Sequence, residues 1–569
     1  MFTLLGATIA GLTLSHAARA TAYTLHSSVI FSLYGDRTPI LSPGDFVLTS
    51  LGAQQLYDSG AAFRARYIAS PAENKAHNFT ESSPILGIST NNIDNSQIYV
   101  AAVDLYHVVN SAQAFLQGLY PAIGFLTSSP FLPSESVLAN GTAIDYPLNG
   151  YQYCPVHTYR PTDPNLIWLA GDINCEEYLV SAYKYYSSDE FMSIENSTQP
   201  FYQDIAAKGL RGIPPNTIVG YYNAYDIYDY VNYGYTHNAS VRENISSDEL
   251  VQLRALASRQ MFDLNGNKSA SGIIEGDMIR TIAGQTLAAK VLGLLEKHVD
   301  SKGVLGQLSV MFGDLEPFLA FFALSGLSNV NSNFKGLPNL GSAMVFELFS
   351  LDSDNQTYPS ESDLWVRFLF RNGTSDDQNL IAYSLFGEGR SNTDMKWTDF
   401  QNQMANFMRP KVRDWCNTCA SISTFCAFYT GNFTFSDGLD SPSHEGLTPQ
   451  VAGVIGAAVT LAVVGLAVAA MFLGGIRFSR TSSRRRSELG GFKGSQKLAS
   501  DADLTSGKAP TSVMAARGHE RVGSWELGEN KAEEHGFGSL HRPRDLPPHD
   551  GDDISVNPMG EPVKVDDRV

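Results

Sequence analysis

The chain of 569 residues lacks the short motifs of several common enzyme classes. It contains no GxSxG, no GxxxxGK[ST] and no HExxH sequence, which argues against an α/β-type serine hydrolase, a P-loop nucleotide site and a zinc peptidase. Its histidines and cysteines form no convincing cluster with metal-ligand spacing. We therefore expect neither a metal ion nor a cofactor.

An excess of positive charge is also missing. Residues 21–476 hold 24 Lys and Arg against 43 Asp and Glu, whereas residues 477–569 hold 15 of each kind. An acidic segment repels nucleic acid and anionic lipid. We expect no nucleic acid as a partner.

Two apolar runs indicate passage through a membrane. Residues 1–20 combine an apolar core with the small-residue pattern Ala18-Arg19-Ala20, which is typical of a cleaved secretory signal peptide; an uncleaved anchor is the alternative. Residues 451–476 are uncharged, and at about 1.5 Å per residue a helix of this length measures about 39 Å. The second run predicts a transmembrane helix.

Arginines directly after the second run predict its orientation. Arg477 and the triplet Arg484–Arg486 follow it, and basic flanks stay on the cytoplasmic side. This predicts a single-pass type I membrane protein of the secretory pathway, at the cell surface, with its tail in the cytoplasm. Glycosylation acceptors of the form Asn-x-Ser/Thr all precede the run: Asn78, Asn140, Asn196, Asn238, Asn244, Asn267, Asn355, Asn372 and Asn432.

Composition divides the chain into five parts. They are a signal peptide (1–20), an ectodomain (21–436), a Pro/Gly/Ser-rich linker (437–450), the transmembrane helix (451–476) and a tail (477–569). The tail has few aromatic residues and no cysteine, so we expect it to be disordered. It could carry phosphorylation sites or bind a cytoplasmic partner, or it could be a solvated flank of the span.

The five cysteines all precede the predicted span, in an oxidising compartment, and an odd number leaves one unpaired. We favour a disulfide between Cys154 and Cys175, and another between Cys426 and either Cys416 or Cys419. A zinc site built from the last three is the sharper alternative, but no histidine lies nearby at ligand spacing.

The ectodomain begins with a strand, a turn and a helix that resemble a known family. Ser27 to Leu33 form a short apolar and β-branched run that leads into the turn GDRTP, and LTSLGAQQLYDSGAAFRARY follows from Leu48 to Tyr67. This pairing resembles the histidine acid phosphatase family, which includes acid phosphatases and phytases and carries RHGxRxP on that strand. The resemblance continues through Ile98–Pro121, Thr281–His298, Leu308–Leu327, Gly341–Leu348 and Trp365–Phe370.

The resemblance implies a fold and a chemistry. The fold is an α/β one, with a parallel-sheet core flanked by helices and a mainly helical insertion lobe within residues 123–270. In the family's mechanism a histidine attacks phosphorus, three arginines and a second histidine hold the phosphate oxygens, and an aspartate protonates the leaving alcohol.

Most of these groups are replaced in this chain. Alignment of SLYGDRTP with the motif places Leu33 at the first arginine and Tyr34 at the nucleophile, while Arg37 retains the second arginine. Tyrosine is a poor substitute, because a phenol with a pKa of about 10 is scarcely ionised at neutral pH.

The segments Ile98–Pro121 and Leu308–Leu327 also lack most of the family's catalytic side chains. Ala101 stands at the third arginine and Gly313 at the second histidine, while Asp314 retains the acid. Asp104 keeps an aspartate, and His107 replaces a further arginine. Two of six polar groups remain, and losing even one transition-state donor costs about 10² to 10³ in rate.

We therefore expect no catalytic residues and interpret the protein as a pseudoenzyme that binds, senses or scaffolds at the cell surface, with an unknown extracellular ligand or protein partner. An active acid phosphatase or phytase-like hydrolase using Tyr34, Arg37, His107 and Asp314 is the rival hypothesis. Each retained residue also has a structural explanation. Arg37 could satisfy loop carbonyls or pair with Asp36 or Asp314, and Asp314 could cap a helix. Tyr34 could fill the cleft, and His107 could be packed or exposed.

Overall fold

The computed structural model describes residues 23–69, 82–122, 136–214, 216–351, 357–375, 380–389 and 391–431. The predicted signal peptide, linker, transmembrane helix and tail lie outside these residues. Within the described part, no helix is both long enough and apolar enough to cross a membrane.

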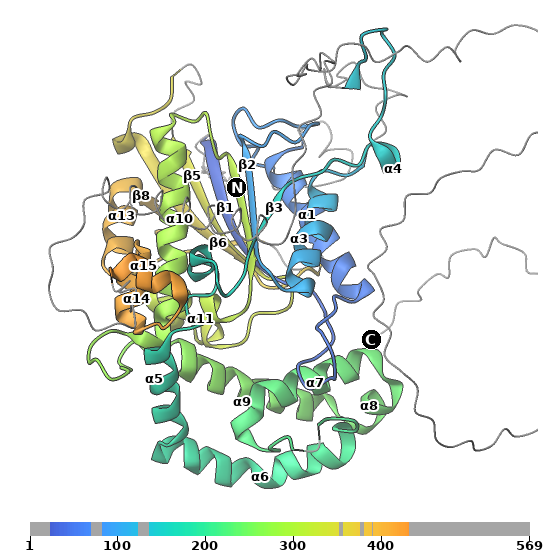
Figure 1. Cartoon of the computed structure of the whole chain (residues 1–569), viewed down its shortest axis with the longest axis vertical. Coiled ribbons are helices and arrows are strands. Elements are labelled where there is room, and N and C mark those ends of the chain that lie inside the picture. Colours follow the sequence, from blue (N-terminus) through green and yellow to red (C-terminus); the bar gives the residue numbers. More distant parts are fainter. Residues whose placement is uncertain are drawn as a thin grey trace, which may run out of the picture. The chain divides into compact units, whose positions relative to one another are not determined.

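An eight-stranded sheet forms the centre of the structure (Figure 1). Its strand order is β3-β2-β4-β1-β5-β6-β7, and β8 pairs with β6. The strands are β1 (Thr24–Leu33), β2 (Ile98–Val103), β3 (Val156–Tyr159), β4 (Leu308–Gly313), β5 (Ala343–Ser350), β6 (Leu364–Arg371), β7 (Ile381–Tyr383) and β8 (Asp394–Lys396).

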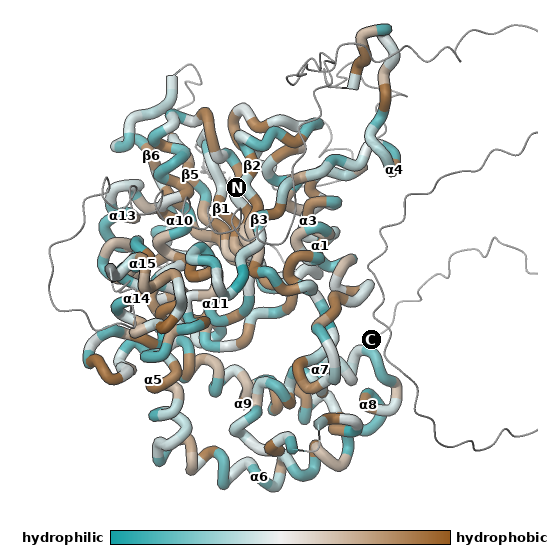
Figure 2. The backbone as a smooth tube through the Cα atoms, in the orientation of Figure 1, coloured by the Kyte–Doolittle hydropathy of each residue, from teal (hydrophilic) through white to brown (hydrophobic). Residues whose placement is uncertain are grey.

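The sheet is mixed, so the expected parallel sheet is only part of it. The pairs β1–β4, β4–β2 and β2–β3 are parallel, whereas β1–β5, β5–β6, β6–β7 and β6–β8 are antiparallel. The central strands β1, β4 and β5 are buried along almost their whole length. Figure 2 shows the hydrophobic character of these strands. Burial on both faces explains their apolar runs, which carry no sign of strand direction.

Helices cover both faces of the sheet (Figure 1). Helices α1 (Ser50–Tyr67) and α3 (Tyr106–Leu119) lie on one face, and α10 (Ile282–Asp300) and α13 (Trp397–Ala405) lie on the other. The first pair packs backbone to backbone, because a Cβ atom on Gly60 would lie 1.9 Å from the Phe115 carbonyl oxygen and one on Gly118 would lie 2.0 Å from that of Tyr57. The remaining short helices are α4 (Pro147–Gly150), α11 (Glu316–Leu324), α12 (Leu327–Val330), α14 (Val412–Cys419) and α15 (Thr424–Thr430).

A helical lobe lies beyond one end of the sheet (Figure 1). It consists of α5 (Glu176–Tyr186), α6 (Asp189–Gly209), α7 (Ala224–His237), α8 (Ala239–Asn244) and α9 (Ser247–Asn265). These helices lie within the expected range of 123–270, which also contains β3, a strand that pairs with β2 in the sheet. The described residues also include the 3-10 helices η3 (Pro164–Trp168), η4 (Tyr221–Asn223), η5 (Ile279–Thr281), η6 (Ser332–Lys335) and η7 (Glu361–Asp363).

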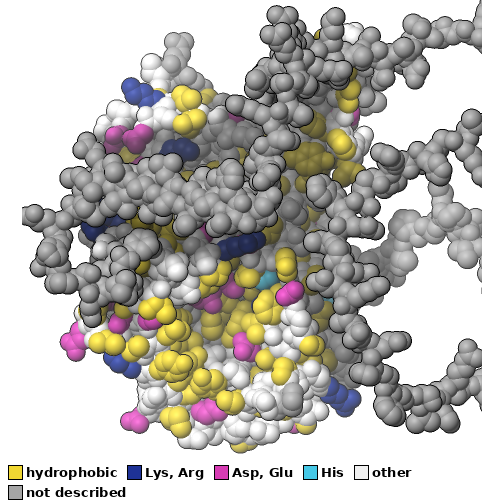
Figure 3. Space-filling view, in the orientation of Figure 1, with side chains coloured by type: hydrophobic (Ala, Val, Ile, Leu, Met, Phe, Trp, Pro, Cys, Tyr) yellow, Lys and Arg dark blue, Asp and Glu magenta, His cyan; other side chains and the backbone are white. Residues whose placement is uncertain are grey.

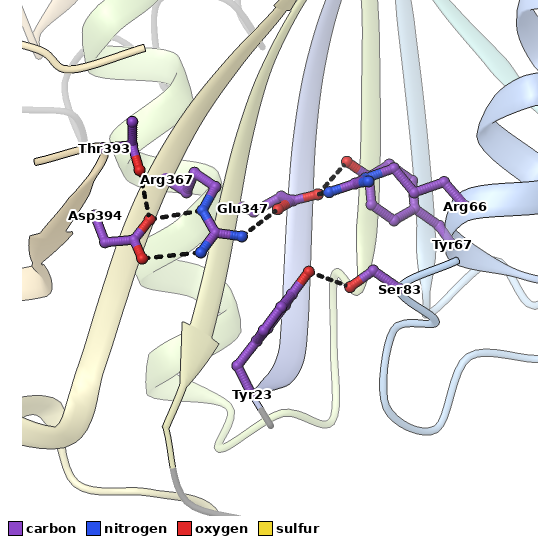
Figure 4. A network of polar contacts seen from close by, with 8 residues as sticks. All are labelled: Tyr23, Arg66, Tyr67, Ser83, Glu347, Arg367, Thr393 and Asp394. Atoms are coloured by element: carbon purple, nitrogen blue, oxygen red, sulfur yellow. Dashed lines mark hydrogen bonds and ion pairs between the residues drawn. The ribbon is translucent and has the colours of Figure 1, made fainter. Parts of the chain in front are cut away.

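A buried carboxylate ties α1 to the antiparallel half of the sheet (Figure 4). The side chain of Glu347 on β5 is fully buried, and its Oε1 accepts hydrogen bonds from Arg66 Nε at 2.8 Å and from Tyr67 Oη at 2.7 Å. Arg367 on β6 lies 4.0 Å from the other oxygen and donates to Asp394 at 2.6 and 2.8 Å. Such a buried charge needs these partners to offset the cost of removing it from water.

Candidate functional site

The positions that correspond to the family's catalytic motif meet at one end of the parallel strands. Leu33 ends β1 and Gly313 ends β4, and the two residues pair directly. Ala101 lies on β2, the other neighbour of β4, and is fully buried. The sequence alignment therefore brings together residues that the fold also places on adjacent strands.

Two glycines allow the GDRTP turn to pack against the start of α1. A Cβ atom on Gly35 would lie 2.4 Å from the Gly52 carbonyl oxygen, and one on Gly52 would lie 2.1 Å from that of Asp36. The turn is also fixed by a hydrogen bond of 2.9 Å from the Thr49 amide to the Asp36 carbonyl. This contact holds the side chains on either side of the turn in place.

Tyr34, Arg37 and Asp314 form a connected polar cluster at this end of the sheet. The hydroxyl of Tyr34 donates to Asp314 Oδ1 at 3.2 Å and accepts from Arg37 Nη2 at 3.1 Å. Tyr34 and Arg37 are 1% and 5% exposed. The phenol thus occupies the interior of the site, between the retained cation and the retained carboxyl group.

Arg37 is held by a partner that the sequence did not indicate. Its Nη1 donates to Asp229 Oδ2 on α7 at 3.0 Å and to the Thr38 carbonyl at 2.9 Å. The same Asp229 oxygen accepts from the Ile40 amide at 2.8 Å. The expected bond from Arg37 to a loop carbonyl is thus confirmed, whereas its acidic partner is Asp229 and not Asp36 or Asp314. Asp36 contacts His237 on α7, at 2.7 Å.

Burial sets the protonation of these groups. It raises the pKa of Tyr34 far above its ordinary value, and the charge of Asp314 adds to the effect. It also raises the pKa of Asp314 and of Asp229, although the charge of Arg37 opposes both shifts. Because its pKa is raised, Tyr34 remains a neutral phenol, and a neutral phenol is a weak nucleophile.

Two further carboxyl groups lie close to Asp314. Burial raises the pKa of Asp172 to about 6, and the charge of Asp314 contributes. The pKa of Glu316 is raised well above its ordinary value, first by burial and then by Asp314 and Asp172. A phosphate dianion placed here would face several acidic groups and one already paired guanidinium.

His107 is buried inside the site and packs against Tyr34. It is 3% exposed, and its ring meets the Tyr34 ring edge-on at 4.6 Å between centroids. Burial, and next the charge of Arg37, lower the pKa of His107 to about 3. This histidine is neutral, as expected for a packed side chain.

Gly313, one of the replaced positions, has no room for a larger side chain. A Cβ atom on Gly313 would lie 2.7 Å from the Phe31 ring and 3.2 Å from the Leu169 carbonyl oxygen. Asp104, three residues after Ala101, forms an ion pair with Arg160, whose side chain is 78% exposed. Asp314 does not cap α11, whose N-cap residue is Leu315, but its Oδ1 accepts a hydrogen bond from the Leu315 amide at 2.8 Å.

A pocket of about 260 Å³ opens beside the cluster, between the sheet and the lobe. Leu33, Asp36 and Asp229 form the wall that it shares with the cluster. Arg254 on α9 also lines it, but donates to Tyr228 Oη at 2.9 Å and to Asn339 Oδ1 at 2.8 Å. The face shown in Figure 3 presents hydrophobic and acidic side chains at its centre, with a basic side chain and a histidine among them. No three His, Cys, Asp or Glu side chains of the described residues are placed to hold a metal ion.

The disulfide pattern differs from the favoured one. Cys175 pairs with Cys419 and Cys416 with Cys426, which leaves Cys154 free. The pairing of Cys154 with Cys175 was wrong because α14 packs against the start of α5 and brings Cys419 to Cys175. The pairing of Cys426 with Cys416 was one of the two predicted options. Because Cys416, Cys419 and Cys426 all form disulfides, they are not zinc ligands.

The glycosylation acceptors differ in accessibility. Asn372 is half-buried, and its side-chain oxygen accepts from the Asn339 amide at 3.0 Å and from Ser342 Oγ at 3.2 Å. It is therefore the least suitable acceptor among those described. Exposed acceptors are Asn140, Asn196, Asn238, Asn244 and Asn267, while Asn78, Asn355 and Asn432 lie outside the described residues.

Comparison with known proteins supports the resemblance seen in the sequence. The model of the histidine phosphatase superfamily (branch 2) matches residues 37–204. This part of the chain is therefore similar to that superfamily. Prostatic acid phosphatase of Homo sapiens is 24% identical over 308 residues, which cover 50% of this chain and 69% of that protein. Lysosomal acid phosphatase of Xenopus laevis is 24% identical over 414 residues, covering 69% of this chain and 78% of the relative.

Solved histidine phosphatase structures are also similar to this chain. The phytase of Citrobacter braakii has a TM-score of 0.42 at 12% identity and covers 69% of this chain and 99% of its own. Multiple inositol polyphosphate phosphatase of Bifidobacterium longum, solved with phosphate, has a TM-score of 0.40 at 12% identity and covers 69% and 94%. The resemblance to histidine acid phosphatases seen in the sequence is thus confirmed by the family match and the two acid phosphatase relatives.

Sequence reasoning missed Asp229 and the pocket beside it. Asp229 lies 192 residues after Arg37, in a tyrosine-rich helix of the lobe. A hint was present, because α7 repeats polar and aromatic residues at helical spacing, and Tyr225, Tyr228 and Asp229 all line the pocket. That spacing gives a shared helix face, but not the part of the sheet that the face meets.

Proposed function

We propose that this chain is a non-catalytic histidine phosphatase domain that binds a ligand in the pocket beside Arg37 and does not hydrolyse phosphomonoesters. The observation that carries the proposal is the occupation of Arg37. Its two terminal nitrogens already donate to Asp229, to the Thr38 carbonyl and to Tyr34. An arginine that binds phosphate needs those same nitrogens for the phosphate oxygens.

The chemistry of the neighbouring groups supports this proposal. Phosphoryl transfer depends on positive charge around the phosphate oxygens and on an in-line nucleophile. The Tyr34 hydroxyl is held between Asp314 and Arg37, and burial raises its pKa. The pocket therefore suits a ligand without a phosphate dianion better than it suits a phosphomonoester.

We further propose that the domain is the ectodomain of a single-pass membrane glycoprotein of the secretory pathway. The apolar run at 451–476, the arginines that follow it and the one-sided acceptor sites support this topology. The relatives named as prostatic and lysosomal acid phosphatases also fit a secretory route.

The alternative function is phosphomonoester hydrolysis with an altered set of groups. Two observations favour it. The relatives are named as acid phosphatases, and Tyr34, Arg37, His107 and Asp314 converge at one point. In this alternative Asp314, with its raised pKa, would protonate the leaving alcohol.

An activity assay separates the two functions. The full chain is incubated with p-nitrophenyl phosphate and with phytate from acidic to neutral pH, beside Arg37→Ala and Asp314→Asn. We expect no turnover in the wild type beyond that of either variant. Turnover that both variants abolish, or a phosphoryl adduct trapped on the wild type, would establish the hydrolase instead.

A further inference from the structure

A second pocket lies far from the candidate site, on the face of the sheet covered by α10. It has a volume of about 360 Å³ and is lined by Tyr99, Trp168, Lys290, Gly293, Leu294 and Lys297, among others. Tyr99 is the second residue of β2, whereas the candidate site lies beyond the opposite end of the parallel strands. The volume falls within the range of small-molecule sites.

One face of α10 forms a wall of this pocket. Lys290, Gly293, Leu294 and Lys297 have the spacing that places side chains on a single helix face. A Cβ atom built on Gly293 would meet no atom within 4 Å. The glycine therefore leaves a hollow between the two lysines, and no packing contact among the described residues requires it.

The pocket carries positive charge without a counter-ion. The Lys290 ammonium lies 4.8 Å from the centre of the Tyr99 ring. Within the described part of the chain, neither Lys290 nor Lys297 has a carboxylate oxygen within 4.0 Å, and no Asp or Glu lines the pocket. Burial, and next the charge of Lys297, lower the pKa of Lys290. A bound anion would offset this repulsion.

The rest of the lining offers flat apolar surface. Trp168, on η3, contributes a ring. The Tyr99 ring is already stacked with His157, at 5.4 Å between centroids, and lies beneath the Lys290 ammonium. The Tyr99 hydroxyl is paired with that of Tyr159 at 2.8 Å. No arginine lines the pocket, so the paired donors that suit a phosphate dianion are missing from it. Two lysines beside aromatic rings match a singly charged oxyanion attached to a ring.

We propose that this pocket binds a ring that bears a carboxylate or a sulfate group. Lys290 and Lys297 hold the oxyanion, Trp168 packs against the ring, and Tyr99 positions the Lys290 ammonium. Both an aromatic acid and an acidic sugar have this chemistry. The proposal is independent of the function assigned to the candidate site, because the two pockets share no lining residue.

Calorimetric titration of the full chain tests the proposal. The probes are benzoate and phenyl sulfate for an aromatic acid, glucuronate for an acidic sugar, and benzyl alcohol and glucose as neutral counterparts. We expect an anionic probe to bind at least about tenfold more tightly than its neutral counterpart. Tighter binding of glucuronate would assign the sugar, and tighter binding of benzoate or phenyl sulfate the aromatic acid.

Variants assign the binding to this pocket. Lys290→Met keeps the length of the side chain and should weaken binding by about tenfold or more, and Gly293→Leu should abolish it while both lysines remain. Gly293→Ala and Lys335→Met are controls that should bind as the wild type does; the Lys335 ammonium lies over the Phe262 ring, at 5.7 Å. Equal binding of neutral probes, unchanged affinity in Lys290→Met, tighter binding of phenyl phosphate than of phenyl sulfate, or no binding of any charged probe would overturn the proposal.

Discussion

At the scale of single residues, the site is defined by the contacts of Arg37, the arginine retained from the family motif. Arg37 lies between Asp229 and Tyr34, and its guanidinium also stacks near the Phe46 ring at 5.1 Å. These contacts join the turn after β1 to α7 of the lobe. Arg37 therefore serves as a link between sheet and lobe.

Removing one member of the buried ion pair should be costly. Arg37→Met leaves Asp229 buried without its cation and should lower the free energy of unfolding by about 3–5 kcal/mol. The double variant Arg37→Met/Asp229→Leu should recover part of that loss, because no unpaired charge remains. Urea unfolding checks both values.

A matched exposed pair provides the control for this prediction. The side chains of Arg259 and Glu190 are 50% and 65% exposed, so Arg259→Met should cost no more than about 1 kcal/mol. A double variant no more stable than Arg37→Met would contradict the prediction, because removing the unpaired Asp229 charge would then recover nothing.

The sequence predicted which residues occupy the site, but not what they contact. The alignment assigned Tyr34, Arg37 and Asp314 to positions of one family site, and the structure joins these three side chains by hydrogen bonds. Asp229 was not expected, because its helix belongs to a lobe whose position on the sheet depends on contacts between distant segments. Local pattern contains no information on that docking.

At the scale of elements, the two disulfides fix α14 and α15 in different ways. The Cys175–Cys419 bridge joins α5 to α14 across 244 residues, whereas the Cys416–Cys426 bridge closes only 10. In the chain-entropy model, removing the long-range bridge should cost about 5 kcal/mol and removing the short one about 3 kcal/mol.

Urea unfolding of Cys175→Ala/Cys419→Ala and Cys416→Ala/Cys426→Ala compares these costs. The reverse order would show that packing around Trp415, which is buried beside both bridges, matters more than chain entropy. The sequence could not fix this connectivity, because three of the five cysteines lie within eleven residues and the partner of Cys175 is far along the chain.

Gly293 lowers the stability of helix α10, and no packing contact among the described residues requires a glycine there. Gly293→Ala should raise the free energy of unfolding by about 1 kcal/mol, because alanine has the higher helix propensity and the added methyl group meets no neighbour. Thermal unfolding measures the change. A loss of stability would mean that the hollow beside Gly293 is filled in solution.

The direction of the strands could not be predicted from the sequence. Residues 341–348 and 365–370 were expected as strands, and the structure has β5 and β6 there. Their apolar runs look like those of the parallel strands, because strands buried on both faces look alike in sequence. The antiparallel half of the sheet could therefore be predicted as strands but not in its orientation.

At the scale of the whole molecule, the buried groups His26 and Asp226 change the free energy of unfolding in opposite directions as the pH changes. Burial, and next the charge of His298, lower the pKa of His26 from its ordinary value of 6.5 to about 4. Burial, and next the charge of Asp229, raise the pKa of Asp226 from its ordinary value of 3.8 to about 6. The first group sits beside β5, with its Nε2 2.9 Å from Ser350 Oγ, and the second lies on α7.

The two groups should have opposite effects between about pH 4 and 6. Unfolded His26 binds a proton that the folded protein excludes, so its contribution to stability is complete above pH 6.5 and is lost as pH falls towards 4. Folded Asp226 retains a proton that the unfolded chain releases, so its contribution is present at low pH and is lost as pH rises from 3.8 towards 6. Urea unfolding across this range should show His26→Gln gaining stability relative to the wild type as pH falls, and Asp226→Asn gaining it as pH rises. Parallel profiles for either variant and the wild type would mean that the group titrates alike in the folded and unfolded protein, and hence that its burial has no electrostatic cost.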